Sequence, residues 1–148
     1  MISGKLVHLM DSHQEAILDR VEQLNRRDPD MRRSQAILGS GRRHWNKELL
    51  EDLSQWLGNG TGETLAVRYR GMGRERFEQG IRLSECMRDL CLLKETLLDY
   101  VQEHTFNKDS VELYAEEELD RRVGRFFDLL IVHIVRGYES APKPQAAA

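Results

Sequence analysis

Cysteine, proline and net charge are all scarce in this sequence, and each scarcity excludes a class of protein. The 148 residues include 2 cysteines and 3 prolines, and the formal net charge is −3. Two cysteines cannot build a disulfide framework, which indicates a reducing compartment. The small negative charge excludes the strong basic field that nucleic-acid-binding domains carry. We therefore expect no nucleic-acid partner.

Long apolar runs are also missing. No run approaches the roughly 20 residues that span a bilayer, and the segment Met1–Lys5 lacks the apolar core of a signal peptide. These features predict a cytoplasmic protein without membrane insertion. Hydrophobic residues make up 40% of the chain and charged residues 32%, a composition typical of a folded, helix-rich domain.

Apolar residues recur at helical spacing along almost the whole chain, and no segment has the alternation of a strand. Ser12 and Glu15 have capping-box spacing, so the first helix is expected to restart there. Asp28 and Pro29 predict a helix start, and Ser84 is expected to cap the fifth helix. We predict an all-α, single-domain bundle of five to six helices over residues 1–140, with a disordered tail over 141–148.

The last predicted helix, from Ser110 to about Tyr138, is the longest. Its first half is charged, but residues 126–135 are apolar on nearly every face. One contact within a bundle cannot cover all of these faces, so the segment is either central to the core or faces a second chain. The residues predicted to form a subunit seam are Phe126, Leu130, Ile131, Ile134 and Val135.

Catalytic and metal-binding motifs are missing. The glycine-rich segment 58–62 lacks the Gly-Lys-Ser/Thr ending of a phosphate loop, and 71–76 lacks the third glycine of a dinucleotide fingerprint. Gly71 and Gly73 are expected instead to let two helices approach closely. None of the five histidines follows a glutamate by three residues, as di-iron bundles require. We predict a protein that is not an enzyme and needs no cofactor or metal.

A few side chains remain as candidate ligand contacts. His13 lies in the apolar stripe of the first helix, where it is either a hydrogen-bonded histidine at the core edge or a haem ligand in a globin-like bundle. Arg74 and Arg76 belong to the densest basic patch. Arg76 either pairs with a buried carboxylate or holds an anionic ligand. Cys86 and Cys91 are interpreted as buried small hydrophobic residues.

Three blocks of the sequence resemble the stressosome co-antagonist (RsbRD-type) N-terminal domain family. They are His13–Arg20, the stretch from Arg42 to Leu53, and Gly73–Glu85. The resemblance implies an all-helical sensor or protein-interaction domain. Members of this family usually precede an output module such as a kinase or a DNA-binding regulator, whereas only about ten tail residues follow here.

These observations favour a non-catalytic regulatory domain that acts as a homodimer and has a regulatory protein partner of unknown identity. Two alternatives stay open. One is a globin-like sensor that binds haem or a small ligand through a histidine. The other is an adaptor that binds the helix of a partner protein through the same apolar surface.

Overall fold

The computed structural model describes residues 2–58, 62–104 and 110–142. Within these ranges the chain forms six α-helices and one 3₁₀ turn, and no strand is present. The all-α prediction is confirmed, including the long C-terminal helix. The elements are α1 (Ile2–Arg27), η1 (Pro29–Met31), α2 (Arg32–Leu38), α3 (Gly41–Gly58), α4 (Glu63–Glu78), α5 (Leu83–Glu103) and α6 (Ser110–Ser140).

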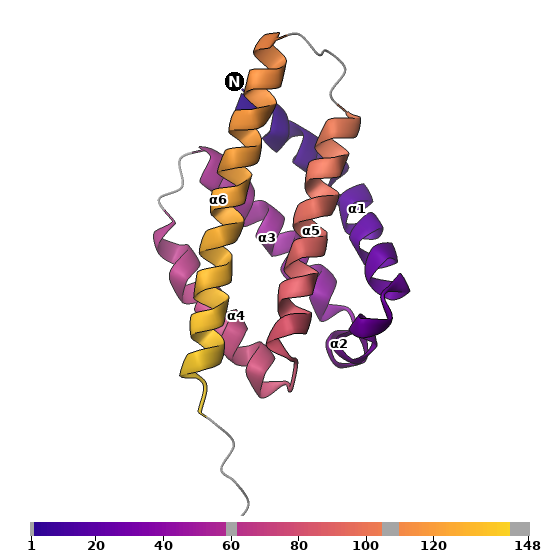
Figure 1. Ribbon diagram of the computed structural model, residues 1–148, viewed down its shortest axis with the longest axis vertical. Coiled ribbons are helices and arrows are strands. Elements are labelled where there is room, and N and C mark those ends of the chain that lie inside the picture. The colour runs from indigo at the N-terminus through magenta and orange to yellow at the C-terminus, as the bar shows by residue number, and fades with distance from the viewer. Residues whose placement is uncertain (1, 59–61, 105–109, 143–148) are drawn as a thin grey trace, which may run out of the picture.

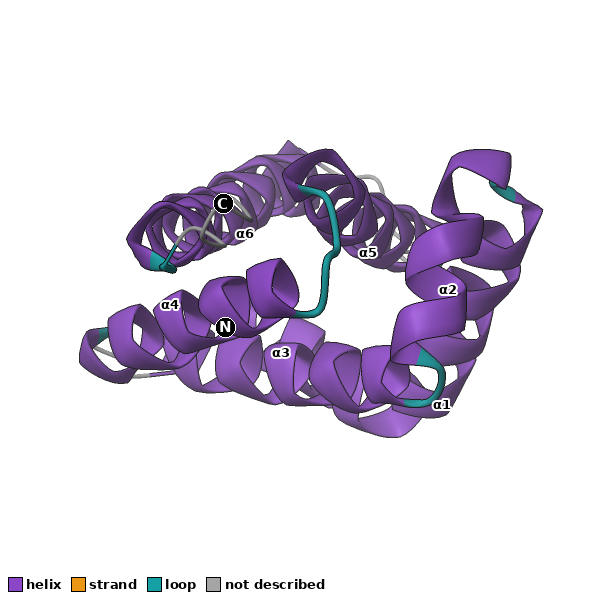
Figure 2. Cartoon of the chain, turned by 90° about the horizontal axis from the view of Figure 1, so that it is seen from below, coloured by secondary structure: helices purple, strands orange, loops and turns teal. Residues whose placement is uncertain are grey.

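The helices are arranged around one core. Viewed along the bundle, α5 and α6 lie on one side, α3 and α4 lie on the other, and α1 and α2 close one edge (Figure 2). Helix α6 runs the length of the molecule beside α5 (Figure 1). It packs most extensively on α4, and it also contacts α5, α1 and α3. These four neighbours cover the inner faces of the apolar half of α6, while Leu129 and Val132 on its outer side remain exposed.

Local sequence signals explain where several helices begin and end. The Asp28 carboxylate accepts a hydrogen bond from the backbone N–H of Asp30, with Pro29 at the first helical position, as predicted. At the end of α4, Gly80 has a φ of 80°. The N–H of Gly80 donates to Phe77 and that of Ile81 donates to Arg76. This is a Schellman motif, which ends the helix.

Two further predictions concern α1 and α5. Helix α1 contains a break at His13, with a φ of −121° and a ψ of 18°, next to the restart predicted at Ser12. The prediction that Ser84 caps α5 is wrong, because Arg82 is the capping residue. The carboxylate of Glu85 accepts a hydrogen bond from the Arg82 backbone N–H at 3.4 Å, and α5 starts two residues earlier than predicted.

Helices α4 and α6 touch through two glycines. A Cβ atom at Gly73 would lie 2.2 Å from the carbonyl oxygen of Ile134, and one at Gly137 would lie 2.1 Å from that of Arg70. Real Cβ atoms do not approach backbone oxygens so closely, so only glycine allows this packing. The predicted role of Gly73 is confirmed. The same prediction for Gly71 is wrong, because no atom lies within 4 Å of its Cβ position.

The core runs between all the long helices, and its largest fully buried side chains include Tyr69, Phe126 and Phe127. Among the residues that the structure describes, no helix combines the length and the apolar character that a membrane crossing requires. Most of the predicted tail, residues 143–148, lies outside the described ranges. Ala141, which was assigned to that tail, is 6% exposed.

Candidate functional site

A salt bridge between Arg42 of α3 and Asp89 of α5 lies inside the bundle. The Arg42 Nε donates to Asp89 Oδ2 at 3.0 Å, and the two side chains are 9% and 16% exposed. A second Arg42 nitrogen donates to the Ser34 hydroxyl of α2 at 3.0 Å. The Asn25 amide of α1 donates to the other Asp89 oxygen. This network, called the buried ion pair below, satisfies both charges with partners from four helices.

Opposing effects act on the pKa of Asp89 in the buried ion pair. Burial raises the pKa of Asp89 above its ordinary value of 3.8, while the positive charge of Arg42 and the hydrogen bonds from Arg42 and Asn25 act in the opposite direction. This pair was not singled out from the sequence. A signal was nevertheless present, since Asp89 lies three residues after Cys86 and four before Leu93, within the apolar stripe of α5.

Arg76, near the end of α4, is a second buried cation. It is only 4% exposed. Its Nη1 donates to the Gln79 side-chain oxygen at 3.1 Å, and its guanidinium carbon lies 5.9 Å from the centre of the Trp45 ring, within range of a cation–π contact. Burial lowers the pKa of Arg76. The carboxylate that the sequence led us to expect beside Arg76 is bound by Arg42 instead.

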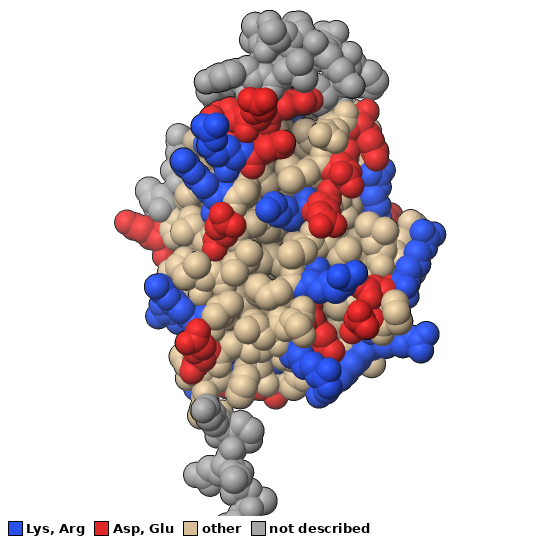
Figure 3. All heavy atoms as spheres, in the orientation of Figure 1, with Lys and Arg blue, Asp and Glu red and all other residues tan. Residues whose placement is uncertain are grey.

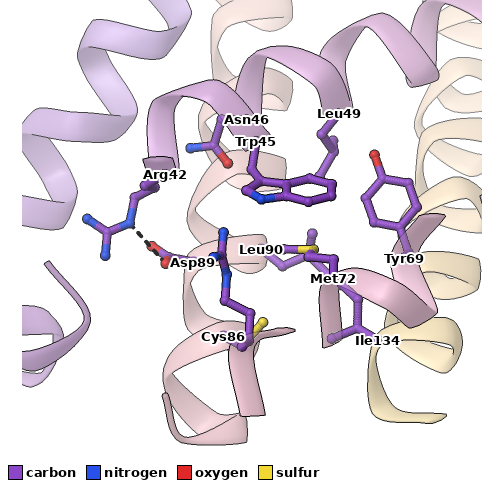
Figure 4. A pocket seen from close by; sticks show the side chains of 11 residues that line it. Arg42, Trp45, Asn46, Leu49, Tyr69, Met72, Cys86, Asp89, Leu90 and Ile134 are labelled. Carbon is purple, nitrogen blue, oxygen red and sulfur yellow. Dashed lines mark hydrogen bonds and ion pairs between the residues drawn. The ribbon is translucent and has the colours of Figure 1, made fainter. Parts of the chain in front are cut away.

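Arg42, Asp89 and Arg76 all line one small cavity. It has a volume of about 20 Å³ and is lined by side chains from four helices, room for about one water molecule. Figure 4 shows Arg42 joined to Asp89 at one side, with the Trp45 ring above and Met72 below. The lining residues that carry polar groups are Arg42, Asn46, Tyr69, Arg76, Cys86 and Asp89.

His13 lies outside this cavity, where α1 meets the end of α5. Its Nδ1 is 2.7 Å from the Tyr100 hydroxyl, and its ring centre is 5.1 Å from that of His104. Tyr100 stacks on His104 and lies under the guanidinium of Arg20. Of the two interpretations of His13, the structure shows the hydrogen-bonded one. The contact holds the broken part of α1 against the end of α5.

The candidate ligand contacts therefore do not form one site. Arg74 is exposed and pairs with Glu78 at 3.3 Å on the surface of α4. Arg76, two residues later, points into the core. His13 lies with Tyr100 and His104 and so belongs to neither arginine's surroundings.

The two cysteines differ in their exposure. Cys86 is buried and Cys91 is exposed, which corrects the interpretation of Cys91 as a buried residue. Burial raises the pKa of the Cys86 thiol to about 11, so Cys86 remains protonated and unreactive at neutral pH.

The predicted subunit seam needs a correction. Phe126, Leu130 and Ile134 are each 0% exposed, because they face the core that α6 shares with its neighbours. Covered by their own chain, these three residues cannot also contact a second subunit. The other two seam residues, Ile131 and Val135, are half-buried at the edge of the core.

The outer side of α6 carries apolar side chains that the prediction did not include. Leu129 is 36% exposed and Val132 is 45% exposed. They are three residues apart and so neighbours on one helix face. The middle of the face formed by α5 and α6 is largely uncharged, and lysine, arginine, aspartate and glutamate side chains surround it (Figure 3). Leu129, Val132, Ile131 and Val135 are called the α6 outer patch below.

The sequence was compared with protein families, curated proteins and solved structures. Residues 11–143 match the family described as the RsbT co-antagonist protein rsbRD N-terminal domain. The match spans nearly the whole chain and includes α6 and all residues of the buried ion pair. No curated protein and no solved structure matched.

Proposed function

Because the chain belongs to the RsbT co-antagonist protein rsbRD N-terminal domain family, we propose that it is a non-catalytic regulatory domain that acts as a homodimer through the α6 outer patch. The family is one of stressosome-type regulatory domains. A regulatory domain must pass a change in its own packing to another polypeptide. The long α6 is suited to this, since it contacts α1, α3, α4 and α5 and has one side uncovered.

The exposure of Leu129 and Val132 is the observation that carries the proposal. Single apolar side chains are common on protein surfaces, but these two are adjacent, and half-buried Val135 follows Val132 by three residues on the same side of α6. Covering them removes apolar surface from water, which favours association by about 25 cal/mol per Å². A second copy of the chain supplies the same patch, so a two-fold symmetric contact places apolar surface on apolar surface.

Light scattering after size-exclusion chromatography tests the homodimer. The wild-type protein at tens of micromolar is expected at about twice its mass of 17.2 kDa. Val132→Asp places a charge in the patch and is expected to give a monomer with an unchanged helical circular dichroism spectrum. A wild-type protein that elutes as a monomer would overturn the homodimer.

Val67 of α4 provides the matched control. It is an apolar valine that is 80% exposed on another helix, so Val67→Asp introduces the same charge outside the patch. This variant is expected to remain a dimer. Dissociation of both variants would show that added negative charge, and not the loss of a specific contact, separates the subunits.

The adaptor alternative gives a different result in the same experiment. A monomeric wild-type protein that forms a complex with a partner's helix, and loses that complex on Val132→Asp, would assign the patch to the partner. Only in that case does the experiment require the regulatory partner to be identified.

A further inference from the structure

We propose that the cavity beside Arg76 is a binding site for a single small monovalent anion of halide size. The proposal is independent of the oligomeric state and concerns the interior of one chain. It starts from the charges around the cavity: two arginines, Arg42 and Arg76, and one carboxylate, Asp89, line it. Their formal charges leave an excess of one positive charge in a region shielded from water.

Arg76 is the less compensated of the two cations, because Asp89 attracts it through charge but hydrogen-bonds Arg42. Asp89 is 3.0 Å from Arg42 and also accepts a hydrogen bond from Asn25, so its two oxygens are occupied by partners other than Arg76. The five N–H groups of Arg76 make one hydrogen bond among the described residues, to the neutral side chain of Gln79. The other nearby carboxylate, Glu75, is exposed, so solvent weakens its attraction to Arg76.

Burial of a cation without a close counter-charge is costly. An ion that leaves water loses its hydration, and this loss is offset only by a partner within the same low-dielectric region. The Trp45 ring at 5.9 Å contributes a weak attraction. An anion in the cavity would contact the guanidinium directly and restore neutrality to the group of three charges.

The size of the cavity limits the ligand. A volume of about 20 Å³ is close to the room that one water-sized particle needs, so a monatomic anion fits it better than sulfate, phosphate or a carboxylic acid. Nonpolar groups of Leu49, Met72, Leu90 and Ile134 form the rest of the wall, and they suit a weakly hydrated halide. Chloride is the representative of this class that we commit to. Its site would join α3, α4, α5 and α6 through one ion.

Thermal unfolding in different sodium salts at constant ionic strength tests the site. Sodium gluconate is the reference, because gluconate cannot enter the cavity. The melting temperature is expected to rise with the logarithm of the chloride concentration above the dissociation constant, and to be higher by about 4 °C when chloride exceeds that constant ten-fold. Equal melting temperatures in chloride and gluconate at all concentrations would overturn the proposal and leave the cavity to water.

Arg76→Met and Arg74→Met are the matched variants. Both remove a guanidinium from α4, but Arg74 is exposed and paired with Glu78. Arg76→Met is expected to lose the chloride-dependent increase and to be at least as stable as the wild type in gluconate, because the buried charge is gone. Arg74→Met is expected to keep the increase. A chloride effect that persists in Arg76→Met would contradict the assignment.

A direct measurement does not depend on the folding of any variant. Crystals of the wild-type protein grown in bromide are expected to show an anomalous difference peak within contact distance of the Arg76 guanidinium. Bromide peaks confined to the surface would overturn the site. Neither measurement depends on dimer formation, so this proposal and the homodimer can fail separately.

Discussion

At the scale of single residues, burial decides which polar side chains matter in this molecule. His133 of α6 has a buried Nδ1 without a hydrogen-bond partner among the described residues. Burial lowers its pKa below the ordinary value of 6.5, and the positive charges of Arg136 on α6 and Arg70 on α4 lower it further. The folded protein therefore keeps this imidazole neutral where the unfolded chain protonates it.

This shift predicts a pH dependence of stability. Because the unfolded chain binds the proton more readily, the contribution of His133 is fully present above about pH 6.5 and is lost as the pH falls below it. The urea midpoint of the wild type is expected to fall between about pH 7.5 and pH 5.5, and His133→Gln is expected to reduce this fall. An identical fall in the two proteins would show that other groups cause it.

At the scale of helices, the contact of α4 with α6 depends on two missing side chains. Gly73→Ala would place a methyl group 2.2 Å from the Ile134 carbonyl oxygen. Because backbone and not a flexible side chain stands in the way, we expect a loss of about 3 kcal/mol or more in the free energy of unfolding. Urea denaturation followed by circular dichroism measures this change.

Gly71→Ala is the control for that experiment. Gly71 lies in the same helix with no atom near its Cβ position, so alanine only improves helix propensity there. We expect a gain of about 0.5–1 kcal/mol. Comparable losses in both variants would mean that α4 tolerates alanine poorly for reasons unrelated to α6.

Helices were also the level at which the sequence was most informative. Spacing of apolar residues and capping signals located the helices, and Asp28 with Pro29 marked a helix start correctly, because such signals depend on neighbours in the chain. The seam at Phe126, Leu130 and Ile134 failed because burial depends on which helices surround α6. The role of Gly137 was missed for the same reason, since it depends on the backbone of a distant helix, α4.

At the scale of the whole molecule, the buried ion pair ties together α1, α2, α3 and α5 through Asn25, Ser34, Arg42 and Asp89. Sequence spacing placed Asp89 in an apolar stripe but could not show which cation it meets. Asn25 and Asp89, which are joined in this network, lie 64 residues apart in the sequence. Its loss should therefore affect the cooperative unfolding of the bundle as a whole.

A pair of substitutions tests this network. Asp89→Leu alone leaves Arg42 buried without a counter-charge and is expected to cost about 3–5 kcal/mol of the free energy of unfolding. The double variant Arg42→Met/Asp89→Leu removes both charges and is expected to recover most of this loss. Chemical denaturation of the two variants and the wild type provides the comparison. A double variant no more stable than Asp89→Leu would show that the charges themselves hold the helices together.

The glycine contact between α4 and α6 also sets the permitted movements of the two helices. A shift of α6 by one turn would replace Gly137 at the contact by His133 or Ala141, and both carry a Cβ atom that the slot against Arg70 cannot accept. Sliding along this pair is thus sterically blocked in either direction. A displacement of the end of α6 must therefore move α4 with it as a rigid unit, together with Arg76, which is buried on α4.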